Sequence, residues 1–125
     1  MFTYPTVIKR SKNADLLERL HSIKVTEEAA RQVVFDYLNE QEVEEVGFTG
    51  TSGRAICRLY SKERCMLRYP RENKGKLNLY LVLHEIAHFI AYQQFGEKAH
   101  GDTFVNVLDD LAMSEWMWKS GAMDE

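Results

Sequence analysis

Apolar residues change their spacing along this chain, and each spacing predicts a different element. Between residues 79 and 92 they point in every direction around a helix, interrupted only by His84, Glu85 and His88. A surface helix shows a polar stripe, whereas this pattern is typical of a helix that is buried on all sides. Gly96 stands where a helix-ending glycine is expected. The sequence therefore predicts a central buried helix within residues 77–95 that carries three polar groups.

Helical spacing recurs on both sides of this segment. Residues 13–21 carry leucines at helical intervals, Thr26 is placed to cap a longer helix, and a third helix is expected from Asp102 onward. Residues 1–12 lack such a pattern and are expected to form an extended lead-in. Residues 119–125 are expected to form a polar tail.

Residues 43–70 change to a period of two, which is typical of strands. Three strands are expected, over residues 43–49, 54–60 and 64–69, and the short turns between them favour an antiparallel meander. The strand at 64–69 precedes the buried helix and is one candidate for an exposed edge. The sequence thus predicts an α+β fold, with a small antiparallel three-stranded sheet packed against the central helix and its flanking helices.

Length and composition narrow the class of protein. A chain of 125 residues is expected to form a single domain, residues 1–125, and 45% hydrophobic with 28% charged residues is ordinary for a soluble globular protein. The longest apolar run is too short to span a bilayer, so a cytoplasmic protein without a membrane partner is expected. Cys57 and Cys65 are too few for a secreted disulfide framework. Two free thiols are expected, with a disulfide across the hairpin as the alternative.

The polar residues of the central helix carry the candidate chemistry. His84 and His88 are four positions apart, so their imidazoles lie on one face and can share a ligand such as a zinc ion. Glu85, about 100° around the helix, can reach a water on the ion without being a ligand itself. This is the HExxH pattern of metal hydrolases. A purely structural helix is the alternative, but each unpaired polar group in an apolar wall costs about 1–3 kcal/mol.

A third histidine follows a short connection. His100 lies just before the helix that starts at Asp102, where the chain has turned back toward the first two histidines. Three protein nitrogens and a water form an open, catalytic zinc site rather than a closed structural one. An exposed loop histidine is the alternative for His100.

The two segments His84-Glu85-Ile86-Ala87-His88 and His100-Gly101-Asp102-Thr103-Phe104 together resemble the SprT family of zinc metallopeptidases, which includes the Spartan DNA–protein crosslink proteases. The resemblance implies a zincin-like fold and zinc-dependent hydrolysis of peptide bonds. It implies His84, His88 and His100 as zinc ligands, Glu85 as general base and Phe104 as a packing residue. No CxxC pair follows His100, so the likeness is to a minimal form without a zinc ribbon.

A polypeptide is therefore the expected substrate, with DNA as a further candidate partner. The net charge of −3 provides no global basic field for nucleic acid, although a basic cluster precedes the central helix. The alternatives are a zinc-containing module that recognises protein or DNA, a metallohydrolase of another amide, and a structural protein with a chance motif.

Supporting roles are left open by the sequence. An oxyanion donor is expected among Tyr60, Tyr69 and Tyr92, and partners that orient the histidines among Asp102, Asp109 and Asp110.

Overall fold

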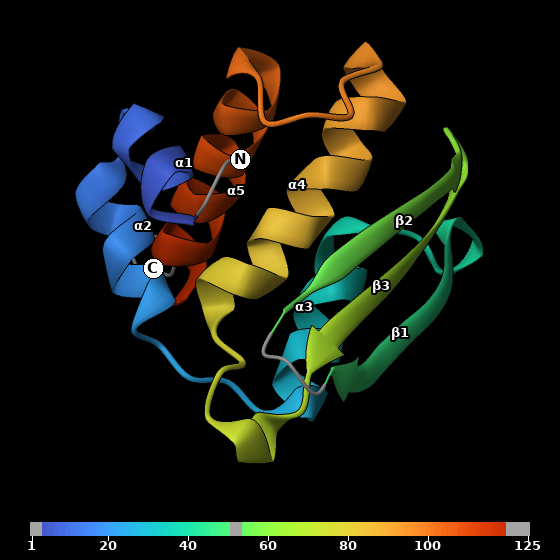
Figure 1. Ribbon diagram of the computed structural model, residues 1–125, viewed down its shortest axis with the longest axis horizontal. Helices are drawn as coiled ribbons and strands as arrows, with labels where there is room; N and C mark the ends of the chain where they lie inside the picture. The colour runs from blue at the N-terminus through green and yellow to red at the C-terminus, as the bar shows by residue number, and fades with distance from the viewer. Residues whose placement is uncertain (1–3, 51–53, 120–125) are drawn as a thin grey trace.

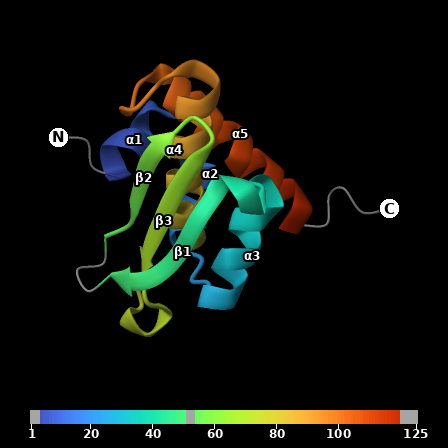
Figure 2. The same cartoon turned by 90° about the vertical axis from the view of Figure 1, so that its right-hand side faces the viewer.

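A computed structural model of the chain describes residues 4–50 and 54–119. Over these residues it is an α+β fold of five helices and one three-stranded sheet. The helices are α1 (Tyr4–Arg10), α2 (Ala14–His21), α3 (Glu27–Tyr37), α4 (Leu79–Phe95) and α5 (Asp102–Lys119). The strands are β1 (Val43–Gly50), β2 (Ile56–Ser61) and β3 (Arg64–Pro70). Figure 2 shows the sheet in front of the helices, so one of its faces is covered by them.

Helix α4 is the centre of the molecule. Helices α2 and α5 pack on one side of it, strands β2 and β3 on the other, and α3 also contacts it (Figure 1). Eleven of its 17 residues are buried, which confirms the buried central helix. The Asn78 side chain caps its first turn by accepting from the Leu81 amide at 2.8 Å, and Gly96 ends it with a φ of 73°.

The predicted antiparallel meander is wrong, because β3 lies between the other two strands. Strand β2 pairs antiparallel with β3, whereas β1 pairs parallel with β3, which makes the sheet mixed. Five of the seven residues of β3 are buried, while β2 alternates between exposed and half-buried residues. The most apolar strand therefore takes the central position, and β2 and β1 form the edges. For the same reason the proposal of 64–69 as an exposed edge is also wrong.

The start of the chain also differs from its prediction. Residues 4–10 form helix α1 instead of an extended lead-in, and residues 1–3 lie outside the described residues. Val7 and Ile8 are 0% and 5% exposed, so one side of α1 belongs to the core. Two apolar neighbours on one helical turn give too short a pattern to distinguish a helix from an extended segment. Of the predicted tail, residues 120–125 also lie outside the described residues.

Other predictions hold. Helix α2 falls within 13–21, Thr26 caps α3 by accepting from the Ala29 amide at 3.0 Å, and α5 begins at Asp102. Cys57 and Cys65 are free thiols, set diagonally across β2 and β3, and their mutual hydrogen bond, followed by burial, raises the pKa of Cys57. Among the described residues no helix is long and apolar enough to cross a membrane.

Candidate metal centre

The three predicted histidines come together between α4 and the start of α5. The Nε2 atom of His100 lies 3.1 Å from Nε2 of His84 and 3.1 Å from Nε2 of His88. His84 and His88 occupy successive turns of α4, and His100 enters from the connection that leads into α5. All three ligand atoms lie within 4.8 Å of one another, a geometry that can hold one metal ion.

Each of the three imidazoles is held in the neutral form that binds metals. Burial lowers the pKa of His84 well below its ordinary value, and the neighbouring His88 and His100 lower it further. Burial, followed by the charge of His100, lowers the pKa of His88 to about 4. For His100 the lowering comes from burial and then from the Arg10 guanidinium, against an opposing effect of Glu97. At neutral pH the cluster therefore presents lone pairs rather than positive charges.

These nitrogens cannot satisfy one another by hydrogen bonding alone. A neutral imidazole carries one N–H and one lone pair, so His100 Nε2 can serve as donor or acceptor but not donate to both neighbours at once. A single cation at the point of convergence accepts all three lone pairs. The chemistry of the donor set thus fits a metal ion better than a hydrogen-bonded cluster.

Two aromatic residues fix the rings. The Phe104 ring is fully buried, with its centroid 4.4 to 4.9 Å from those of all three imidazoles, which confirms its role as a packing residue. The Tyr80 hydroxyl lies 3.1 Å from Nδ1 of His84. When Nε2 of His84 is available to a cation, its proton is on Nδ1 and the hydroxyl oxygen accepts it, which sets the ring orientation.

Tyr80 was missed by the sequence analysis, although a signal for it exists. It stands four positions before His84 on the same helix, the spacing at which side chains meet. The sequence analysis expected only aspartates as orienting groups. Asp102 instead pairs with Arg10 at 2.7 Å, the Asp109 carboxylate accepts from the Ser11 hydroxyl, and Asp110 is exposed.

The expected oxyanion donors also have other places. The Tyr69 hydroxyl is buried and donates to the Val82 carbonyl at 2.9 Å, so it supports the packing of β3 on α4. Tyr60 is 50% exposed on β2. Tyr92 is half-buried on α4, with the Lys98 ammonium 5.1 Å from its ring centroid. The contacts of these three residues do not single out an oxyanion donor.

Glu85 lies next to the histidines on α4. Its side chain is buried, and its Oε2 atom is 4.0 Å from Nε2 of His84. Burial raises the pKa of Glu85 to about 8, because a charged carboxylate is poorly solvated there. A cation at the histidine cluster favours the charged form and so makes this group a base at neutral pH.

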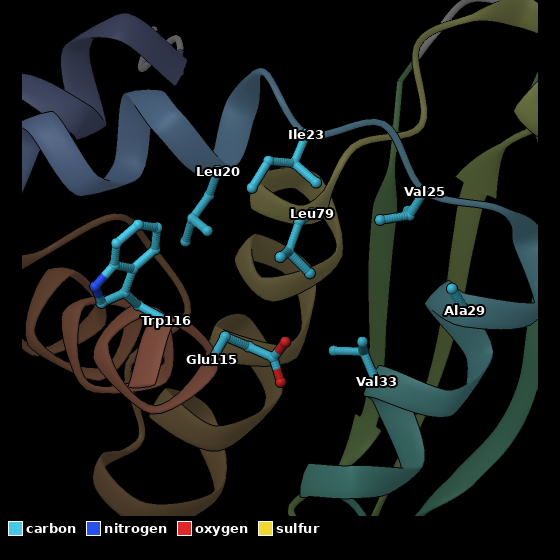
Figure 3. Close-up of a pocket in the computed structure, with 8 residues that line it drawn as sticks. All are labelled: Leu20, Ile23, Val25, Ala29, Val33, Leu79, Glu115 and Trp116. Carbon is cyan, nitrogen blue, oxygen red and sulfur yellow. The ribbon is translucent and has the colours of Figure 1, made fainter. Parts of the chain in front are cut away.

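A second cavity is separate from the histidines. It has a volume of about 410 Å³ and lies between α2, α3, α5 and the start of α4 (Figure 3). Its lining comprises Leu20, Ile23, Val25, Ala29, Val33, Leu79, Glu115 and Trp116. The Glu115 carboxylate faces this space in Figure 3, and the Tyr37 hydroxyl donates to its Oε1 atom at 3.1 Å.

No protein-family model, curated protein or solved structure matches this chain. The geometry of the chain's own residues therefore carries the functional argument. Three neutral imidazoles converge on one point and can bind a metal ion. The buried Glu85 carboxyl, with Oε2 4.0 Å from Nε2 of His84, can provide a proton acceptor beside that ion.

Replacement of any one of the three histidines by alanine should abolish tight metal binding. Loss of an orienting partner lowers metal affinity by about 10- to 100-fold, and loss of a ligand itself should lower it further. Glu28→Ala is the control, because Glu28 is exposed on α3 and does not belong to the cluster. Competition with a chromophoric chelator measures the affinity. Equal affinities in all four variants would contradict the assignment of the site.

Tyr80→Phe should weaken metal binding by about tenfold, because His84 loses the group that fixes its tautomer and ring orientation. Tyr69→Phe removes another buried tyrosine hydroxyl, which donates to the Val82 carbonyl, so it should lower stability and leave metal affinity unchanged. The same chelator competition, together with urea denaturation, separates these effects. Identical behaviour of the two variants would show that Tyr80 acts only through stability.

The metal-free protein should lose stability as the pH falls from about 6.5 to about 4. His88 takes up a proton near pH 6.5 in the unfolded chain but only near 4 in the folded one. Within this window the unfolded chain binds more protons, so acid favours unfolding, by roughly 3 kcal/mol for His88 alone.

Glu85 works in the opposite direction, since its raised pKa of about 8 makes the folded protein hold a proton that the unfolded chain releases. Denaturation of metal-free Glu85→Gln protein across this window therefore isolates the histidines. A free energy of unfolding that stays constant or rises on acidification would show that the histidines are not held neutral.

Proposed function

We propose that this protein is a zinc-dependent endopeptidase with a zincin-like fold, similar to the SprT family. The observation that carries the proposal is the convergence of three Nε2 atoms, with that of His100 3.1 Å from each of the other two and the Glu85 carboxyl 4.0 Å from that of His84. An acid–base group beside a three-nitrogen metal site is the arrangement by which metal hydrolases activate water.

The spacing of the nitrogens supports zinc. Zinc–nitrogen bonds of about 2.0–2.1 Å in tetrahedral directions place two ligand atoms about 3.3 Å apart. The two contacts of His100 Nε2 are 3.1 Å, so a zinc ion fits with a small outward shift of the rings. Three protein ligands leave the fourth direction open, which is the mark of a catalytic rather than a structural site.

The chain's own residues account for the movement of protons. His84, His88 and His100 would hold the zinc ion, which would supply Lewis acidity that lowers the pKa of a water toward about 7 and polarises a substrate carbonyl. Glu85 takes the proton from the water as that water attacks the carbonyl carbon, and then gives it to the nitrogen of the leaving amine. Tyr80 and Phe104 hold the imidazoles in place during these steps.

Strand β2 is the edge at which a polypeptide substrate is proposed to bind. It pairs with β3 on one side, and α4 packs beside it. At the left edge of the sheet in Figure 2, β2 is the strand where an added polypeptide would run close to α4. Backbone hydrogen bonds to an edge strand hold a peptide in register with little regard to its sequence, as endopeptidase activity on unfolded chains requires.

Glu85→Gln should retain zinc and lose cleavage of an unfolded protein substrate by about 10²- to 10⁴-fold, because the variant lacks the proton acceptor. Glu18→Gln, an exposed carboxylate-to-amide change on α2, is the control and should cleave normally. Each protein is assayed by gel with zinc, with and without single-stranded DNA, which also tests DNA as a partner.

Zinc-loaded wild-type protein that cleaves no polypeptide under either condition would overturn the peptidase proposal. A recognition module, or hydrolysis of another kind of amide, would then account for the site. Equal cleavage by wild type and Glu85→Gln would instead remove Glu85 from the mechanism.

A further inference from the structure

The three histidines differ in how their backbones are held. His84 and His88 belong to a buried helix, and their relative placement follows from helix geometry. His100 belongs to the non-helical connection between α4 and α5, which crosses the top of the molecule in Figure 1. A ligand on a connection needs contacts from elsewhere to stay within reach of a pair fixed on a helix.

Arg10, the last residue of α1, supplies such contacts. Its Nη1 atom donates to the backbone carbonyl of His100, and its Nη2 atom donates to Oδ1 of Asp102 at 2.7 Å. A planar guanidinium can grip two acceptors in a fixed orientation, which a lysine ammonium cannot. The Arg10 side chain therefore holds the residue that carries the third imidazole and the first residue of α5 at the same time.

The carbonyl contact matters more than the ion pair. Asp102 is 97% exposed and the Arg10 side chain 31% exposed, so the attraction between their charges is largely screened by water. The hydrogen bond to the His100 carbonyl acts directly on the backbone of the ligand. This hydrogen bond is therefore expected to fix the position of His100 more than it raises the stability of the fold.

Helix α1 is anchored well enough to serve as a support. Val7 and Ile8 are buried in the core, and the next residue after Arg10 donates its hydroxyl to the Asp109 carboxylate. The Lys12 amide donates to the other oxygen of Asp109 at 3.4 Å. Arg10 thus extends from a segment that is fixed to α5 at a second point, two turns along that helix.

We propose that Arg10 is a positioning residue of the metal centre: through the His100 carbonyl and Asp102, α1 holds the third imidazole against the pair on α4. This inference rests on the proposed zinc site. It predicts that the start of the chain contributes to metal affinity although it supplies no ligand.

Arg10→Gln should weaken zinc binding by about tenfold, the lower end of the range for loss of a group that orients a ligand. Arg10→Lys should remain several-fold weaker than wild type, since it keeps the charge but loses the two-point grip. Chelator competition gives the affinities, and the visible spectrum of the cobalt-substituted proteins reports coordination geometry independently of activity.

Two matched controls separate positioning from stability. Thr26→Ala removes the side-chain cap of α3 and leaves the hydrogen bonds of Arg10 in place, so it should lower the free energy of unfolding and leave zinc affinity and the cobalt spectrum unchanged. Arg19→Gln removes an exposed arginine that lies over the Trp116 ring, and should leave zinc affinity and the cobalt spectrum unchanged. Urea denaturation of the metal-free proteins gives the stabilities.

A measurement on the metal-free protein completes the test. Nuclear Overhauser contacts between ring protons of His100 and those of His84 and His88 should be present in wild type and Thr26→Ala, and weakened in Arg10→Gln. Wild-type zinc affinity in Arg10→Gln with unchanged ring contacts would overturn the proposal, as would full recovery in Arg10→Lys or an equal loss in Thr26→Ala. A wild-type protein that binds zinc but cleaves nothing would overturn the peptidase function alone.

Discussion

The burial of α4 is the constraint on which the rest of the structure depends. This helix carries two imidazoles and a carboxyl group into the centre of a domain where each uncompensated polar group costs about 1–3 kcal/mol. Helices on one side and strands on the other exclude water from it, and the same exclusion keeps the histidines neutral and the Glu85 proton tightly held. The packing that forms the core therefore also forms the candidate site, because burial sets the protonation states on which metal binding depends.

The site divides into a part that is rigid by local geometry and a part held by distant contacts. His84 and His88 take their separation from helix spacing, whatever surrounds them. His100 reaches them because Phe104 packs against all three rings and because Arg10, 90 positions earlier, holds its carbonyl. A site of this kind loses its third ligand first when the fold loosens, since that ligand is placed by non-local contacts rather than by helix geometry.

The sheet leaves a strand edge beside α4. With the apolar β3 in the centre, β2 becomes an edge strand next to α4, and its half-exposed side chains fit a surface that is open on one side. An antiparallel meander in chain order would have put β2 in the middle and left β3 as that edge. The mixed order thus decides which strand forms the edge next to α4, and it does so through the relative burial of β2 and β3.

The sequence by itself determined the elements whose signals are local. The apolar surround of residues 79–92, the caps at Thr26 and Gly96, and the spacing of His84, Glu85 and His88 follow from helix periodicity and backbone preference, and each can be read within one or two turns. Tertiary structure decided the strand order, the helical form of α1, and the contacts of Tyr80 and Arg10. Strand order depends on a competition between strands for the buried centre, and the contact of Arg10 joins residues 90 positions apart. A pattern within a short stretch of sequence therefore cannot predict the strand order or the contact of Arg10.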